Sequence, residues 1–347
     1  MERAPPHADA YRAPVWLPGG HLQTIYTSLF ISAPQMSYRR ERLELTDGDF
    51  LDFDWVDGEA HAPVVVLFHG LEGDSASGYA RRLMHSVQAR GWQGVVAHFR
   101  GTSGEDNRLP RAYFAGDSEE IERMLRHVKA IHPTQRIYAV GVSLGGNALL
   151  KWLGENGPDC APVVDAAAAV SAPLDLAAAG TALDSGFNRH TYVRHFLSTL
   201  RRKALDKIAA HRMPVDPAAI RATSTLRQFD DIFTAPLHGF RNADDYWARA
   251  SSKPWLNSIT VPTLLINARN DPFLPASALP SADEVSAQVI RDFPDQGGHV
   301  GFVGGPFPGT LTWLPERVLN FFDAHRADAR VADDAQSRHN SASYVPA

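Results

Sequence analysis

The middle of the chain alternates between short apolar runs and segments in which apolar residues recur every three or four positions. The apolar runs are Pro63–Phe68, Gly94–Phe99, Ile137–Val142, Ala166–Ser171, Thr263–Ala268 and Gln288–Phe293. Strands that are apolar along their whole length are typical of a parallel sheet covered by helices on both faces. The periodic segments predict helices at Ser77–Arg90, Ser118–His132 and Leu144–Glu155. The pattern therefore favours a doubly wound α/β fold.

Two local patterns refine this prediction. Apolar and polar residues alternate from Arg40 to Val56 around the turn Thr46-Asp-Gly-Asp49, which predicts an antiparallel hairpin at one edge of the sheet. Gly91 is expected to end the first helix. Asp117, with Glu120 three residues later, has the spacing of an amino-terminal capping box for the second helix.

The alternation stops between Asp175 and Leu256, where basic helical stretches and polar aromatic stretches replace it. An insertion of this size in a doubly wound sheet commonly lies over the carboxyl ends of the strands. We therefore predict four regions. Residues 1–40 form an extension packed on the core, 41–174 and 257–326 form the core, 175–256 form a helical cap, and 327–347 form a disordered tail.

Composition narrows the class of protein. The 347 residues are 44% hydrophobic and 21% charged, which suffices for a large folded core. A formal net charge of −5 offers no basic field for nucleic acid. One cysteine, Cys160, excludes an internal disulfide. With no signal-peptide pattern and no apolar stretch long enough to span a bilayer, we expect a cytoplasmic protein without an integral membrane segment.

The strongest candidate for chemistry is Gly141-Val-Ser143-Leu-Gly145, between a predicted strand and a predicted helix. This G-x-S-x-G context is typical of a nucleophile elbow, in which a strained turn presents a serine hydroxyl above the sheet. Glycines two positions either side of Ser143 avoid a clash between Cβ atoms in so tight a turn. Ser103, in Arg100-Gly-Thr-Ser-Gly104, is a weaker alternative because no periodic helix follows it.

A serine nucleophile needs a base, and the base needs an acid to hold it in the right tautomer. In the order Ser, Asp, His, the acid is expected to be Asp271, after the apolar run Thr263–Ala268, and the base His299, in Gln296-Gly-Gly-His299. Asp175 is a competing position for the acid. Both preferred residues follow strands, so both can face Ser143.

An oxyanion hole requires two backbone N–H groups, one directly after the nucleophile and one from the loop after an earlier strand. Leu144 and Leu71 are the candidates, the latter in His69-Gly-Leu-Glu-Gly73. His69 is interpreted as a structural residue beneath the site. No metal-binding, Walker or dinucleotide-binding motif occurs, so no cofactor and no metal are implied.

Several short motifs together resemble the YheT-like branch of the α/β-hydrolase superfamily, over about residues 14–325. They are Gly19-Gly-His-Leu-Gln-Thr24, His69-Gly-Leu-Glu-Gly73, Phe99-Arg-Gly-Thr-Ser-Gly104, Asn107-Arg-Leu-Pro110, Gly141-Val-Ser-Leu-Gly-Gly-Asn147, Asp271-Pro-Phe273 and Gly298-His299. This branch includes bacterial proteins named as esterases, yeast medium-chain ethyl-ester synthase/esterases and mammalian membrane-anchored phospholipid hydrolases. The resemblance implies an α/β-hydrolase fold and carries the family's triad onto Ser143, Asp271 and His299.

Two points qualify the resemblance. Thr102 stands where relatives often have cysteine, a change we expect to be neutral, and we expect no counterpart of the mammalian membrane anchor. His21 and Gln23 belong to a family motif whose role the sequence does not explain. A structural hydrogen bond is favoured for them over contact with the active site.

The leading hypothesis is a serine carboxylic-ester hydrolase that forms an acyl-enzyme with short- to medium-chain acyl esters. The same triad serves an acyltransferase or ester synthase, and a non-catalytic binding protein can use the same scaffold. Basic residues of the predicted cap, such as Arg201, Arg202 and Lys203, suit either an anionic acyl carrier or a solvated helix face, and the latter is favoured.

Overall fold

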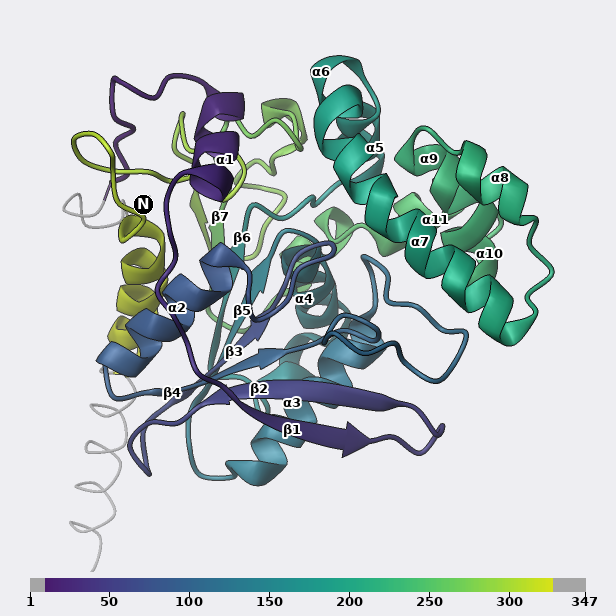
Figure 1. Ribbon diagram of the computed structural model, residues 1–347. Helices are drawn as coiled ribbons and strands as arrows, with labels where there is room; N and C mark the ends of the chain where they lie inside the picture. The colour runs from purple at the N-terminus through teal and green to yellow at the C-terminus, as the bar shows by residue number, and fades with distance from the viewer. Residues whose placement is uncertain (1–9, 327–347) are drawn as a thin grey trace, which may run out of the picture.

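The computed structural model describes residues 10–326, which form an eight-stranded sheet with helices on both faces (Figure 1). The strands are β1 (Arg39–Glu44), β2 (Phe50–Val56), β3 (Val64–Phe68), β4 (Gln93–Ala97), β5 (Ile137–Val142), β6 (Ala166–Val170), β7 (Thr263–Ile266) and β8 (Val289–Asp292). Their order is β1-β2-β4-β3-β5-β6-β7-β8. β2 is antiparallel to both neighbours and the other pairs are parallel. The predicted sheet with its antiparallel edge hairpin is confirmed.

The order of the strands places the site. From β3 the chain moves to β4 on one side, then returns to β5 on the other. In open α/β sheets, ligands bind at the carboxyl ends of strands where the order reverses in this way. The loop that begins at His69 and the turn at Ser143 therefore emerge beside each other.

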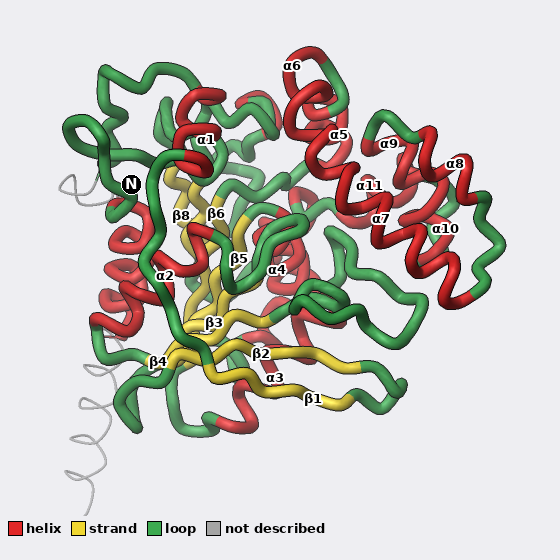
Figure 2. Tube along the Cα trace, viewed as in Figure 1, coloured by secondary structure: helices red, strands yellow, loops and turns green. Residues whose placement is uncertain are grey.

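Strand side chains alternate between two core layers. Val64, Val66 and Phe68 face the layer covered by α3 (Ser118–Ile131) and α4 (Leu144–Asn156). Val65 and Leu67 face the layer covered by α2 (Gly78–Ala89) and by the helical residues 313–326. Because both faces are covered, β2, β3, β5 and β6 are buried along their whole length. The continuous apolar pattern of β3, β5 and β6 predicts this, whereas β2 carries Asp52 and Asp54, which pair with arginines of β1. Figure 2 shows the strands with helices to either side.

The segment between β6 and β7 is helical and lies to one side of the sheet's upper edge (Figure 1). Its helices are α5 (Leu176–Leu183), α6 (Gly186–Asn188), α7 (Arg194–His211), α8 (Pro217–Ala222), α9 (Leu226–Phe229), α10 (Ala235–Leu237) and α11 (Ala243–Ala250). Helices α5, α7, α8 and α9 share a hydrophobic cluster that includes Leu197, Ile208 and Phe233 and also takes in Phe273, from the loop after β7. This cluster joins the helical segment to the edge of the sheet. Helix α11 instead packs against the main core.

Near the amino terminus, residues 10–38 cross the loop that follows β8. Tyr11 donates its hydroxyl to the Val303 carbonyl at 2.8 Å, and Trp16 donates its indole N–H to Gly305 O at 3.1 Å. α1 (Gly20–Leu29) lies in this region. The predicted tail at 327–347 falls outside the described residues. Within residues 10–326, no helix is long and apolar enough to cross a membrane.

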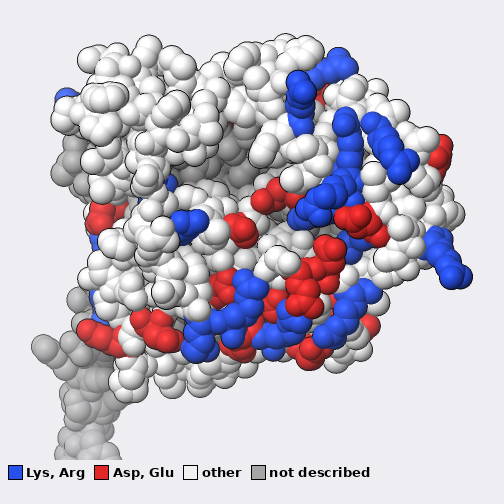
Figure 3. Space-filling model, in the orientation of Figure 1, with Lys and Arg blue, Asp and Glu red and all other residues white. Residues whose placement is uncertain are grey.

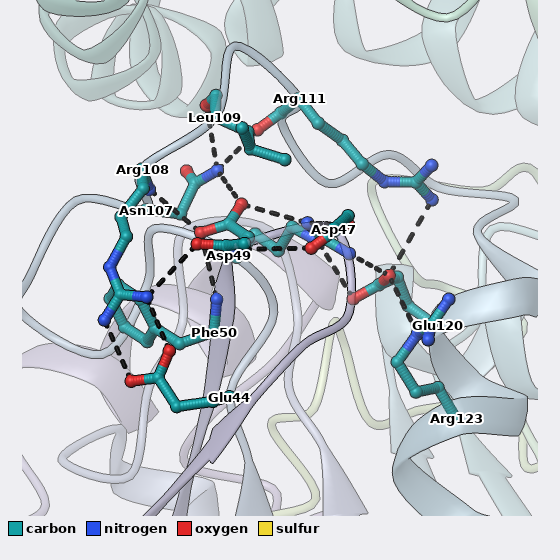
Figure 4. A network of polar contacts seen from close by, with 12 residues as sticks. Glu44, Asp47, Asp49, Phe50, Asn107, Arg108, Leu109, Arg111, Glu120 and Arg123 are labelled. Atoms are coloured by element: carbon teal, nitrogen blue, oxygen red, sulfur yellow. Dashed lines mark hydrogen bonds and ion pairs between the residues drawn. The ribbon is translucent and has the colours of Figure 1, made fainter.

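A buried ionic network ties the hairpin turn to the loop after β4 and to α3 (Figure 4). Arg100 pairs with Asp49 at 2.9 Å and with Glu120 at 2.8 Å. Asn107 donates its side-chain amide to Asp49 at 2.7 Å. Asp117 stands at the amino-terminal cap position of α3, as predicted, but the hydrogen bonds of a capping box with Glu120 do not form. Glu120 binds Arg100 rather than reaching back along the helix, and Asp117 pairs with Arg111 and caps no helix amide.

Candidate active site

Ser143 occupies the sharp turn between β5 and α4. Its φ is 53°, in the left-handed region that L-residues seldom adopt, so the backbone is strained where the hydroxyl is presented. A Cβ on Gly141 would lie 2.5 Å from the Gly145 carbonyl oxygen, and one on Gly145 would lie 2.5 Å from Phe68 O. Only glycine fits at either position, which is the steric reason inferred for the G-x-S-x-G spacing.

The three residues selected from the sequence come together in one hydrogen-bonded chain. His299 Nε2 lies 3.0 Å from Ser143 Oγ, and His299 Nδ1 lies 2.9 Å from Asp271 Oδ2. Because a carboxylate only accepts, Nδ1 carries the proton and Nε2 is free to accept from the serine. Asp271 is fixed in turn by the Phe273 N–H, at 2.8 Å.

The alternatives lie elsewhere. Asp175 accepts a hydrogen bond from the Ala178 N–H at 3.0 Å and so caps α5. Ser103 is buried and donates to Asp52 at 2.6 Å. The structure brings Asp271, and neither of these residues, to His299.

α1 supports the loop that carries His299. Thr24 Oγ accepts the His299 backbone N–H at 2.8 Å, and the Gln23 side-chain oxygen accepts the Gly297 N–H at 2.8 Å. Gly298 has φ 60°, and a Cβ there would lie 2.7 Å from Thr24 Oγ. Gln23 therefore has the structural hydrogen bonds expected of it. Thr24, the last residue of the motif Gly19–Thr24, was given no role from the sequence, although its place in that motif was a usable signal.

His21 does not reach the triad. It is exposed and its ring packs on Phe187 and Tyr192, with Nδ1 3.3 Å from the Tyr192 hydroxyl. Tyr192 packs on Phe273, whose ring stacks on His299 with a centroid distance of 4.0 Å. His21 thus joins α1 to the helices between β6 and β7.

Leu144 and Leu71 are the residues whose backbone amides were predicted to hold an oxyanion. Leu144 is the first residue of α4, so its N–H belongs to the first turn, where the helix supplies no acceptor. Leu71 borders the cavities at Ser143, and a Cβ on its neighbour Gly70 would lie 3.1 Å from Ser143 Cβ. The loop after β3 therefore packs directly against Ser143.

Two side chains, those of Tyr113 and Lys203, hold the residue that follows Leu71. Glu72 has φ 54° and donates its N–H to the Tyr113 hydroxyl at 2.8 Å. That hydroxyl donates back to the Glu72 carboxylate at 2.8 Å. Burial raises the pKa of Tyr113 well above its ordinary value, so the phenol stays protonated. Lys203 of α7 completes the group, 3.0 Å from the same carboxylate.

The basic face predicted for this helix is therefore only partly solvated. Arg202 is exposed and lies 3.6 Å from Asp206, but Lys203 turns towards Glu72. Lys207 also turns inward and donates to Asn107 and to the Leu109 carbonyl. The preference for a solvated face was wrong for Lys203, because the loop that it contacts comes from a distant part of the chain.

His69 lies beneath the site and is fully buried. Nδ1 donates to the Gly70 carbonyl at 2.8 Å, and Nε2 lies 2.9 Å from the Thr102 hydroxyl. Burial, with His98 close by, lowers the pKa of His69 to about 3, so the ring is neutral at pH 7. These contacts agree with the structural role expected for His69.

Two cavities open at Ser143 and His299. The smaller, of about 170 Å³, lies beneath α5, α7 and α9 and is lined mainly by apolar side chains such as Leu176, Leu200 and Phe233. The larger, of about 780 Å³, is bounded by α1, the start of α2 and the start of α7. Figure 3 shows the surface hollowed between the α1 region and these helices, under a face around α1 that is almost free of charged side chains.

The arrangement can be compared with known proteins. Residues 63–306 match the family model described as the alpha/beta hydrolase fold. The chain is 41% identical to the esterase-named protein YheT of Escherichia coli over 310 residues, 88% of this chain and 90% of that protein. It is 30% identical to the human protein named phospholipase ABHD3, over 93% of this chain and 80% of that one. The yeast protein named medium-chain fatty acid ethyl ester synthase/esterase 2 is 28% identical, over 76% of this chain and 62% of that protein.

Solved structures show the same fold. An esterase of Pyrococcus furiosus aligns with a TM-score of 0.53 at 17% identity, over 85% of this chain and 99% of that one. Est1E from Butyrivibrio proteoclasticus, with ferulic acid bound, aligns with a TM-score of 0.55 at 13% identity, over 83% and 99%.

Proposed function

The chain belongs to the alpha/beta hydrolase family, in the branch that contains YheT, and from this premise we propose that it is a serine carboxylic-ester hydrolase of the EC 3.1.1 type. The observation that carries the proposal is the chain of hydrogen bonds from Asp271 through His299 to Ser143, which lies where two cavities meet. Relatives named as esterases support ester hydrolysis as the general reaction.

In the proposed reaction, His299 takes the proton of Ser143 while Oγ attacks the ester carbonyl. The amides of Leu71 and Leu144 hold the resulting oxyanion, and Asp271 stabilises the imidazolium. His299 then gives its proton to the leaving alcohol. Water, activated by the same histidine, releases the acid from the acyl-enzyme. The substrate is a small-molecule acyl ester with a short- to medium-chain acyl group. Neither a nucleic-acid partner nor a cofactor enters the proposal, and a cytoplasmic location stays a prediction.

The test is release of p-nitrophenol from acetate, butyrate, octanoate and palmitate esters by the wild type beside Ser143→Ala. We expect a loss of ~10⁴-fold or more in the variant, because members of a triad act as a unit. Equal activity of the two proteins would show that another residue is the nucleophile. Activity in neither would favour a binding protein on this scaffold.

Acyl transfer to an alcohol is the second candidate, because the name of the yeast relative includes an ester synthase activity. Both reactions pass through the same acyl-enzyme, and the acceptor that reaches it decides the product. Added ethanol would divert product from free acid to ethyl ester if transfer competes with hydrolysis.

A further inference from the structure

The two cavities that meet at Ser143 suit different halves of an ester. Leu71, Ser143, Phe273 and His299 border both cavities, so these lie on either side of the point where the carbonyl carbon must sit. The acyl and alcohol groups of an ester diverge from that carbon. A site with two cavities at its nucleophile therefore holds one group in each.

The smaller cavity has the properties of an acyl pocket. Its walls include Leu183, Leu200, Phe229 and Phe233, and apolar walls of this kind favour a hydrocarbon chain. A cavity of 150 Å³ in another protein holds benzene, so about 170 Å³ accommodates roughly six carbon atoms. Long acyl chains exceed this volume.

The larger cavity is more polar and has room for a bulkier group. Its walls include Thr27 and Ser28 of α1, Arg82 of α2, and His195 of α7. Its volume of about 780 Å³ is in the range of ~300–1,000 Å³ that is usual for pockets that bind drug-sized ligands.

The position of the proton donor decides which group enters which cavity. When the C–O bond of the tetrahedral intermediate breaks, the electron pair stays on the alcohol oxygen. That oxygen must then receive the proton held on His299 Nε2. Val300, next to His299, borders only the larger cavity, as does Val142, which precedes Ser143. Leu144, which follows Ser143 and is a proposed oxyanion donor, borders only the smaller cavity, so the oxyanion lies on that side and the imidazole on the other. The alcohol group therefore leaves on the side of the larger cavity.

We propose that the preferred substrates are esters whose alcohol group is larger than their acyl group, with the alcohol group in the cavity beside α1 and a short acyl chain beneath α7. Residues 24–33 of the amino-terminal segment then contribute to the selectivity for the alcohol, together with the start of α2 and the start of α7, which border the same cavity. This inference rests on the proposed function, because it assumes an ester cleaved at Ser143.

Two isomeric esters test the inference directly. Octyl butanoate and butyl octanoate have the same composition, so they differ in which side of the carbonyl carries the long chain. The wild type is expected to hydrolyse octyl butanoate with a kcat/KM at least tenfold higher, measured as alcohol released. Equal rates, or a preference for butyl octanoate, would overturn the inference.

A pair of variants that fill each cavity provides the matched control. Ser28 donates only to the carbonyl of Thr24 in its own helix, so Ser28→Trp narrows the larger cavity with little loss of bonding. Leu200→Trp narrows the smaller one. The ratio of kcat/KM for octyl butanoate to that for butyl octanoate should fall in the first variant and rise in the second. The opposite shifts would assign the cavities the other way round.

Failure of this inference can be distinguished from failure of the proposed function. Each protein is also given p-nitrophenyl acetate and a small fluorophosphonate probe, and its thermal unfolding is measured to establish that it is folded. Hydrolysis of the acetate ester with no hydrolysis of octyl butanoate would overturn the inference alone. A folded wild type that cleaves no ester and does not react with the probe would overturn both.

Discussion

Single hydrogen bonds at the active site connect residues that are far apart in the sequence. Thr24 accepts the backbone N–H of His299, 275 positions away, and so fixes the height of the imidazole above Ser143. Thr24 does not contact the reacting atoms, so it is a positioning residue. It acts through the loop that carries His299, the proposed base.

Removing the Thr24 hydroxyl while keeping the shape of the side chain tests this role. Thr24→Val should lower kcat by roughly tenfold with little change in KM, since a small displacement of a catalytic group is costly to the transition state. Thr24→Ser, which keeps the acceptor, should retain most of the activity. A variant with a raised KM and unchanged kcat would contradict the account.

Asp230 gives a prediction about pH. Its carboxylate borders the smaller cavity and accepts the Trp247 indole N–H at 2.8 Å. Withdrawal from solvent raises the pKa of Asp230 to about 7. The pKa of an aspartate in the unfolded chain is about 3.9, so between about pH 4 and pH 7 the folded protein holds a proton on Asp230 that the unfolded chain has lost. The free energy of unfolding therefore falls as pH rises through this range.

Asp230→Asn removes this titration and keeps an acceptor for Trp247. The difference in unfolding free energy, variant minus wild type, should therefore grow from pH 4 to pH 7 and level off above. Urea unfolding at pH 5 and pH 8 measures it. A difference that is the same at both values would show that Asp230 has an ordinary pKa.

At the scale of elements, α7 joins the helices between β6 and β7 to the loop after β3, which carries the proposed oxyanion donor Leu71. Lys203 on this helix pairs with Glu72, the residue after the proposed donor Leu71, and Tyr113 holds Glu72 from the other side. A shift of α7 would move Lys203 and with it the Glu72 side chain. The backbone at Glu72 has a positive φ and so little freedom to adjust, and the shift would therefore displace the neighbouring N–H of Leu71.

Lys203→Met should lower kcat by roughly tenfold, less than the ~10²–10³ that follows outright loss of an oxyanion donor. KM should change little, and Lys203→Arg should restore part of kcat because it keeps the charge. If Lys203→Met changed only the melting temperature, with kcat unaltered, the pair would have a structural role alone.

The ionic network of Figure 4 is the second contact that joins elements. Arg100 is almost completely buried between Asp49 and Glu120, which are buried as well. Arg100→Met would remove the buried cation that pairs with Asp49 and Glu120, and breaking a buried pair in this way costs about 3–5 kcal/mol of unfolding free energy.

The exposed pair Arg39–Asp57 provides the control, at 3.1 Å with both side chains more than half exposed. Arg39→Met should change stability by no more than about 0.5 kcal/mol, as is usual for pairs on the surface. The free energy of unfolding of both variants is measured with urea. If Arg100→Met and Arg39→Met lost the same amount, burial would not be what makes the Arg100 ion pairs stabilising.

At the scale of the whole molecule, the features that could be predicted are those with a local signal. Strands buried on both faces are apolar along their length, so β3, β5 and β6 were placed within one or two residues. The elbow at Ser143 requires glycine at fixed spacing, and Asp271 and His299 follow strands in a fixed order. Each of these constraints appears within a few neighbouring residues.

Contacts between distant segments could not be predicted in the same way. The bond from Thr24 to His299, the pair Lys203–Glu72 and the ion pair of Glu120 with Arg100 depend on the fold. The sequence around Glu120 resembles a capping box because Glu120 stands three residues after Asp117. That spacing is the same whether Glu120 bonds back to the start of the helix or pairs with a distant arginine. The division of the site into two cavities likewise arises only when α1 and the helices between β6 and β7 pack around one serine.

The most direct test of the central claim is to locate the covalent adduct of a fluorophosphonate probe. Peptide mass spectrometry of the labelled wild type should find the adduct on Ser143, and His299→Ala should label far more slowly because its serine lacks a base. An adduct on Ser103 or on another residue, or no adduct on a folded protein, would contradict the account of Ser143 as the nucleophile.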